Sequence, residues 1–133
     1  MALATYTELG SRAGNIKRFA VDDAQTISKG TLCMMKDSVK CSGATLTGEK
    51  FAGIAAEQKV ANDGNTSIGL FTEGRFSITN SNGTILTGEY VAMSGANLIR
   101  RAQIADVISG GTLGQALQDA AANAQVIVEI GNN

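Results

Sequence analysis

The sequence predicts a mainly β protein: a small antiparallel β-barrel or sandwich with an extended N-terminal arm and at most one short helix. Three observations support this fold class. Segments with a two-residue apolar period recur about every ten residues from Ile16 onward. Gly, Asn, Asp and Ser separate these segments, as turns between strands require. Hydrophobic residues make up 44% of the chain, which is too apolar for a disordered protein. Strands at this spacing are typical of sandwiches and barrels.

The first residues lack this period. Between positions 2 and 15 a few apolar side chains are scattered among Thr, Ser, Gly and Arg. Such a segment cannot offset the entropy of its own ordering without a partner surface, so we predict an arm over residues 1–18. A frayed terminus is the alternative. Residues 19–133 are predicted to form one β-rich domain, because 133 residues is a usual length for a single-domain chain.

Two strands are indicated most clearly. In residues 75–79, Phe76 and Ile78 alternate with polar side chains, and residues 125–130 alternate in the same way. Turns are predicted at residues 62–65 and 82–83, whose Asn, Asp and Gly tolerate a positive φ.

Residues 112–122 can be interpreted in two ways. Leu113, Ala116, Leu117 and Ala120 have helical spacing, and Ala is the best helix former. Gly114 disfavours a helix by about 1 kcal/mol, and the flanking segments are strands. A short helix and a strand ending near Leu117 followed by a loop both remain open.

A short internal similarity is present as well. Residues 43–52 and 83–92 share a Leu-Thr-Gly-Glu sequence. This similarity indicates either a duplicated β-unit or one strand lead-in used twice. The second interpretation is favoured, because repeat architectures normally need about three copies or more.

The two cysteines allow a geometric prediction. If residues 36–38 form a hairpin loop, Met35 lies opposite Val39 and Cys33 opposite Cys41. A disulfide would fit this register with a small adjustment, so its formation is left open. Since the N-terminus shows no export signal, two reduced thiols packed as small hydrophobes are favoured.

The charge balance and the missing residue types exclude several functions. With 11 Lys plus Arg against 12 Asp plus Glu, the chain has no basic field for nucleic acid. It contains no His, the commonest general base and metal ligand. Asp22 and Asp23 are neighbours that point apart on a strand, and residues 63–65 lack the spacing of a calcium loop. We therefore predict no catalytic, metal or cofactor-binding residues. With neither a signal peptide nor an apolar span, synthesis in the cytoplasm is expected.

The order of elements resembles that of phage head decoration proteins, also called capsid cement proteins. The resemblance runs from about Lys29 to Gly131 and lies in the layout of short segments. In order, these are residues 30–32, 51–55, 74–78, 88–91, 113–117 and 126–130.

The resemblance implies a small β-rich domain, often a barrel or tulip-like fold, without enzymatic activity or cofactor. Such proteins form homotrimers on the outside of an icosahedral head. The implied partners are the major capsid protein and the chain itself, with no nucleic acid and no membrane. The implied location is the outer capsid surface of the virion, after synthesis in the host bacterial cytoplasm.

In this interpretation the arm grips the capsid. Extended, it could span about 50 Å, and it could add a strand to the edge of a capsid sheet. The candidate capsid-binding residues are Leu3, Tyr6, Leu9, Arg12, Lys17 and Arg18.

Two alternatives belong to other classes. Another virion component, such as a tail tube or head fibre base, shares this composition. A small β-barrel binding or enzyme domain would need Cys33, Ser or Thr as nucleophile. The sequence indicates no activating base for it.

Overall fold

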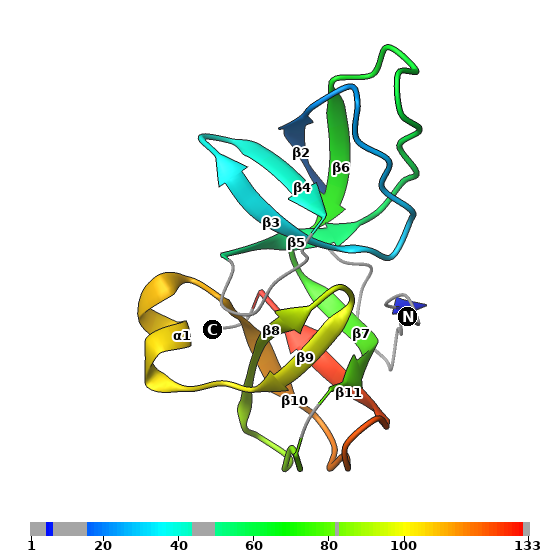
Figure 1. Cartoon of the computed structure of the whole chain (residues 1–133). Coiled ribbons are helices and arrows are strands. Elements are labelled where there is room, and N and C mark those ends of the chain that lie inside the picture. The colour runs from blue at the N-terminus through cyan, green and yellow to red at the C-terminus, as the bar shows by residue number, and fades with distance from the viewer. Residues whose placement is uncertain (1–4, 7–15, 44–49, 82, 132–133) are drawn as a thin grey trace.

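The computed structural model consists of two β-barrels stacked end to end, with one short helix at the side of the second barrel (Figure 1). It describes residues 5–6, 16–43, 50–81 and 83–131. The predicted mainly β class, with a barrel and one short helix, is confirmed.

The first barrel is a closed ring of five strands in the order β2-β4-β3-β5-β6. Its strands are β2 (Ile16–Val21), β3 (Leu32–Asp37), β4 (Lys40–Gly43), β5 (Phe51–Ala55) and β6 (Ser67–Phe71). Strands β2 and β4 are parallel, and every other pair in the ring is antiparallel.

The second barrel follows directly along the chain. Its sheet has the order β1-β7-β11-β10-β8-β9, and a parallel pairing of β7 with β9 closes it. The elements are β1 (Thr5–Tyr6), β7 (Gly74–Asn80), β8 (Tyr90–Gly95), β9 (Leu98–Arg101), α1 (Ile104–Ser109), β10 (Thr112–Ala116) and β11 (Gln125–Ile130). Strand β1 pairs with β7 through Thr5–Ser77 and Tyr6–Phe76.

The two rings have the same topology. Strands β2, β3, β4, β5 and β6 correspond to β7, β8, β9, β10 and β11, and the parallel pair falls between the first and third strand of each ring. The registers also correspond. Met35 pairs with Cys41 as Met93 pairs with Ile99, and a register shift follows both pairs. The isolated bridge between Ile27 and Lys59 matches the one between Ile85 and Ala120.

This duplication is not the one that the shared Leu-Thr-Gly-Glu sequence suggested. Phe51 opens β5 and Val91 lies in β8, and these strands are not equivalent; residues 44–49 lie outside the described residues. The equivalent positions with identical residues include Ile27 and Ile85, Gly30 and Gly88, Met35 and Met93, Gly53 and Gly114, Ala55 and Ala116, and Asn62 and Asn123.

The predicted division into an arm and a β-rich domain stays a prediction, because most of residues 1–15 lie outside the described residues. The boundary between residues 18 and 19 falls inside β2, so Lys17 and Arg18 belong to the first barrel. Residues 19–133, predicted as one domain, contain parts of two rings.

Strand alternation creates the cores. The predicted alternation is confirmed in β7, where Phe76 and Ile78 are buried, and in β11, where Val126, Val128 and Ile130 are buried. A smaller cluster fills the first barrel and includes both cysteines.

One close approach in each ring requires glycine. A Cβ on Gly114 would lie 1.9 Å from the Glu129 carbonyl oxygen. At the equivalent Gly53, a Cβ would lie 2.8 Å from the Phe71 carbonyl oxygen. The paired neighbouring strand comes so close at these points that its backbone leaves no room for a side chain.

Within residues 112–122, strand β10 ends at Ala116 and a loop follows it. The strand interpretation was therefore right, and the short helix lies earlier in the chain. The Ile104, Val107 and Ile108 spacing is typical of a helix face, and this signal could have predicted α1.

Candidate interaction surface

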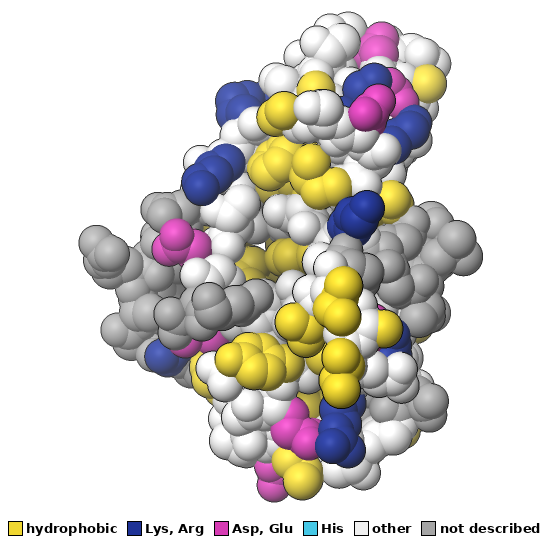
Figure 2. Space-filling model, turned by 90° about the vertical axis from the view of Figure 1, so that its left-hand side faces the viewer, with side chains coloured by type: hydrophobic (Ala, Val, Ile, Leu, Met, Phe, Trp, Pro, Cys, Tyr) yellow, Lys and Arg dark blue, Asp and Glu magenta, His cyan; other side chains and the backbone are white. Residues whose placement is uncertain are grey.

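The two most exposed large hydrophobic side chains among the described residues lie on helix α1. Ile104 is 82% exposed, Ile108 83% and Val107 61%. Their spacing places all three along one side of a helix. In Figure 2, where the α1 side of the molecule faces the viewer, hydrophobic side chains run in a row over this region.

Polar contacts hold the helix in this orientation. The Asp106 carboxylate accepts a hydrogen bond from the Gln103 backbone N–H at 2.8 Å and forms an ion pair with Arg100 at 2.8 Å. Gly110, with φ 85°, ends the helix. Because Asp106 is buried, these contacts anchor the helix to the barrel while its aliphatic side chains face outward.

Tyr90 extends the apolar surface onto the barrel. It is 44% exposed at the start of β8. A hollow of about 250 Å³ lies between Tyr90, Ile104 and Val107. A second hollow, of about 560 Å³, is lined by Tyr90, Val107, Gly110 and Thr112. We call Tyr90, Ile104, Val107 and Ile108 the α1–Tyr90 surface.

The rim of this surface is charged. Arg101 Nε lies 3.1 Å from Glu89 Oε2, and the Arg101 side chain is largely exposed. An apolar centre with a polar rim is the usual anatomy of a protein–protein contact.

The predicted capsid-binding residues lie elsewhere. Tyr6 is in β1, which pairs with β7 of the second barrel. Lys17 and Arg18 are in β2 of the first barrel, whereas α1 belongs to the second. Leu3, Leu9 and Arg12 lie outside the described residues. Arg18 donates hydrogen bonds to Glu57 at 2.9 Å and to the Ser67 hydroxyl at 3.0 Å. Of the predicted capsid-binding residues, Lys17 and Arg18 thus lie on the same strand, β2, while Tyr6 lies on β1.

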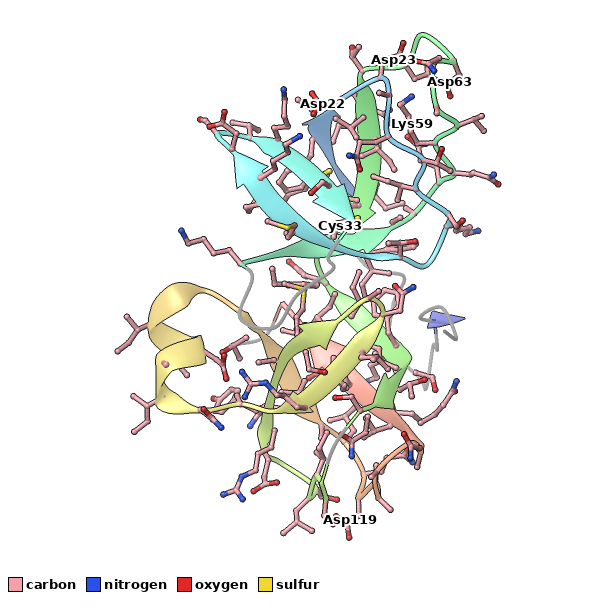
Figure 3. All side chains as sticks on the ribbon, in the orientation of Figure 1. Asp22, Asp23, Cys33, Lys59, Asp63 and Asp119 are labelled. Carbon is pink, nitrogen blue, oxygen red and sulfur yellow. The ribbon has the colours of Figure 1, made fainter. Side chains whose placement is uncertain are left out.

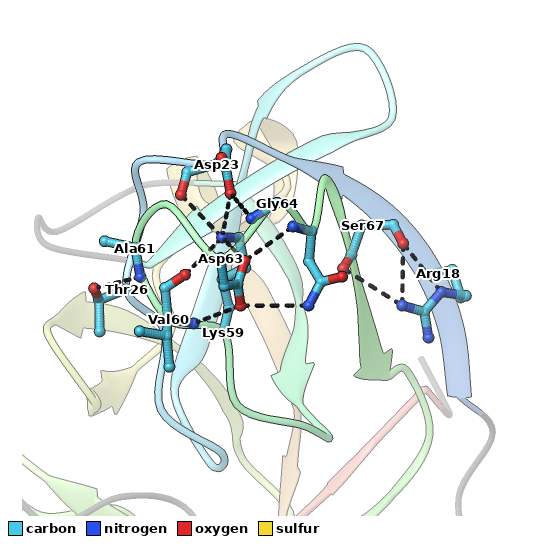
Figure 4. Close-up of polar contacts among 10 residues, drawn as sticks. Arg18, Asp23, Thr26, Lys59, Val60, Ala61, Asp63, Gly64 and Ser67 are labelled. Carbon is cyan, nitrogen blue, oxygen red and sulfur yellow. Dashed lines mark hydrogen bonds and ion pairs between the residues drawn. The ribbon is translucent and has the colours of Figure 1, made fainter.

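A buried lysine joins two loops of the first barrel. Lys59 is 1% exposed, and its ammonium donates to Asp63 Oδ1 at 2.7 Å and Asp23 Oδ1 at 3.0 Å (Figures 3 and 4). It also donates to the carbonyls of Asp23 and Val60. Burial alone would lower the pKa of Lys59, but the hydrogen bonds to the two carboxylates outweigh it and raise that pKa. The same contact holds the pKa of Asp63 well below its usual range. These contacts tie the loop that carries Asp23 to the loop that carries Val60 and Asp63.

A second ionic cluster lies beside it. Asp22 accepts from Lys36 at 2.6 Å and from Lys40 at 2.9 Å. These two hydrogen bonds lower the pKa of Asp22 to about 2. The cluster fastens the end of β2 to the β3–β4 hairpin.

The predicted cysteine register was wrong. Met35, not Cys33, lies opposite Cys41, and Cys33 lies opposite Gly43. The turn is formed at residues 38–39, and a bulge between Met35 and Asp37 shifts the pairing. Both cysteines are buried free thiols, as the favoured interpretation expected. The hydrogen bond with Cys41, together with burial, raises the pKa of Cys33.

Within the described residues, no three His, Cys, Asp or Glu side chains gather as metal ligands, and no helix is long and apolar enough to cross a membrane.

No protein-family model matches the chain, and no curated protein is significantly similar to it. The resemblance to decoration proteins therefore stays a prediction.

Proposed function

We propose that this protein is a structural component of a phage virion. It binds the outside of the capsid as a homotrimer and stabilises the expanded head by bridging major capsid protein subunits. In this proposal it is not an enzyme, and its partners are the capsid protein and itself rather than nucleic acid or membrane.

The observation that carries the proposal is the α1–Tyr90 surface. Three aliphatic side chains, each at least 61% exposed, occupy one six-residue helix beside an exposed Tyr. Clustered apolar exposure of this kind marks protein interaction sites. A protein whose work is assembly needs such a surface.

The two closed rings suit the same role. A closed barrel leaves few free strand edges, which favours specific assembly over aggregation. Many copies on one shell add their contacts, so each contact can be modest. A protein that binds only the expanded shell stabilises that state by mass action.

Co-sedimentation with undecorated, expanded heads of the phage that carries the gene tests the proposal. We expect the wild-type chain to sediment with the heads to a saturating, fixed ratio. Wild-type chain that stays in the supernatant at every concentration would contradict the proposal.

The predicted gripping segment can be tested in the same assay. Lys17→Glu should reduce occupancy, because Lys17 is exposed on β2 within the predicted capsid-binding set. Lys29→Glu is the matched control, since it makes the same charge change at another exposed position of the first barrel. Equal occupancy for both variants would remove Lys17 from the contact. Deletion of residues 2–15 tests the arm, which is excluded if full occupancy survives.

A further inference from the structure

The first barrel buries one of its faces against the second barrel. Leu32 and Ile54 are fully buried in the cluster that fills the second barrel. The Leu32 backbone N–H donates to the Asn97 side-chain oxygen at 3.0 Å. Asn97 lies in the β8–β9 turn, with φ 59°. The start of β3 in the first barrel thus packs on the β8–β9 hairpin turn of the second barrel.

Because the rings are equivalent, each side of this contact has a counterpart, and both counterparts include side chains that are exposed among the described residues. Leu32 pairs with Ile54 as Tyr90 pairs with Gln115, so Tyr90 is the counterpart of Leu32. Leu32 is 0% exposed, whereas Tyr90 is 44% exposed. Likewise Phe51, which packs on the second barrel, corresponds to Thr112, which lines the larger hollow. The α1–Tyr90 surface therefore includes the place where a following barrel would dock.

The other counterpart is Val39. It occupies the β3–β4 turn as Asn97 occupies the β8–β9 turn, and its φ of 53° is close to the 59° of Asn97. Asn tolerates this left-handed conformation, but for a β-branched residue it is strained. Val39 is also 62% exposed. A strained, exposed apolar residue adds nothing to the stability of its own turn, so its conformation points to a role in contact with another surface.

We propose that copies of this chain associate head to tail. The β3–β4 turn of one copy, with Val39 at its tip, packs on the α1–Tyr90 surface of the next copy. The contact repeats between chains the barrel packing that exists within the chain. Ile104, Val107 and Ile108 flank the incoming turn and supply the apolar area.

The head-to-tail contact determines the symmetry of the assembly. The two patches differ, so the contact is heterologous and must close into a ring or extend into a filament. A closed ring of this kind would be the homotrimer. The contact involves two copies of the chain alone and does not depend on capsid binding.

Sedimentation velocity of the full chain over a concentration series tests the inference. Val39→Asn places in the first turn the residue that the second turn already carries, so the variant should fold. It should weaken association about tenfold or more, as expected when an interface centre is lost. Ile104→Ser with Ile108→Ser should do the same from the other side. Val60→Asn is the control, because Val60 is 52% exposed in another loop of the first barrel.

Mixing distinguishes this contact from other modes. The Val39→Asn chain keeps an intact α1–Tyr90 surface, and the double serine variant keeps an intact turn. The mixture should therefore form heterodimers that grow no further. Normal association of Val39→Asn, no association in the mixture, or a wild-type chain that stays monomeric would overturn the inference. A monomer that still binds heads would overturn this inference and the homotrimer but leave capsid binding standing, and an oligomer that ignores heads would overturn capsid binding but leave this inference standing.

Discussion

The two barrels join the same pair of loops by different chemistry. In the first barrel, the Lys59 ammonium holds the loops through the carboxylates of Asp23 and Asp63. In the second, the Asn80 side-chain amide donates to the carbonyls of Gly83, Ala120 and Ala121. The same backbone hydrogen bond frames both: Asn62 N–H to Asp23 O, and Asn123 N–H to Asn80 O, each 2.7 Å. Strand pairing therefore sets the topology, and the side chains that fasten it can be exchanged.

The barrels also differ in what surrounds them. The face around Leu32 is buried by the second barrel, while its counterpart around Tyr90 faces outward beside α1. This asymmetry within a duplicated fold is the basis for assigning the α1–Tyr90 surface to protein contact.

The largest effect should come from Gly114, where β11 approaches β10 most closely. Gly114→Ala should destabilise the chain by about 3 kcal/mol or more, because its Cβ would overlap the Glu129 carbonyl oxygen, which is backbone and cannot move aside. Gly53→Ala should cost less, since the approach is wider. Urea denaturation of both variants measures the difference. Equal free energies of unfolding for the two variants would contradict the difference in Cβ clearance between Gly114 and Gly53.

Removal of the Asn80 amide should come next. Asn80→Ala should cost about 1 to 3 kcal/mol, because the loop carbonyls of Gly83 and Ala121 lose two hydrogen bonds from the fully buried Asn80 amide. Hydrogen exchange should increase first around Gly83 and Ala121, not in the first barrel. Uniform exchange through both barrels would argue against separate fastening.

Acidification should affect the first barrel at its ionic loops. The folded-state pKa of Asp22 is lowered to about 2, and the pKa of Asp63 is also lowered, against an unfolded value of about 3.9. Carboxylates with depressed pKa values contribute stability that is present above pH ~4 and is lost as the pH falls through the folded-state values. The loss should be modest, because Asp22 is exposed to solvent and screened.

Thermal unfolding between pH 5 and pH 2 measures this loss. Lys59→Met provides the comparison, since it removes the shared partner of Asp63 and Asp23. Its melting temperature should fall less steeply with pH than that of the wild type. An unchanged slope would exclude Asp63 as an acid-sensitive group.

The smallest effect should be a gain. Val39→Asn relieves a β-branched residue of a left-handed conformation and should stabilise the monomer by about 1 kcal/mol. Chemical denaturation at a concentration where both chains are monomeric measures it. A loss of stability would show that Val39 serves the fold of its own barrel.

The fold class and the strands around Phe76 and Val128 were predictable, because apolar and polar residues alternate along a half-buried strand and show which face is buried. The duplication was not predictable, since few equivalent positions share a residue and pairing partners are distant in the chain. The cysteine register failed because a bulge leaves no local signal.

The candidate surface was missed for a related reason. The apolar spacing of Ile104, Val107 and Ile108 is a helix signal, but it spans only one six-residue segment among recurring strand units, and it was missed. The burial of Lys59 also had no signal, because lysines are rarely buried and the carboxylates that pair with it come from two loops.

Capsid binding is tested by cryo-electron microscopy of undecorated, expanded heads mixed with the purified protein. We expect two-lobed density, one lobe per barrel, at every equivalent position on the outer surface of the shell. Shells that remain bare at saturating protein, or density scattered without relation to the lattice, would contradict it.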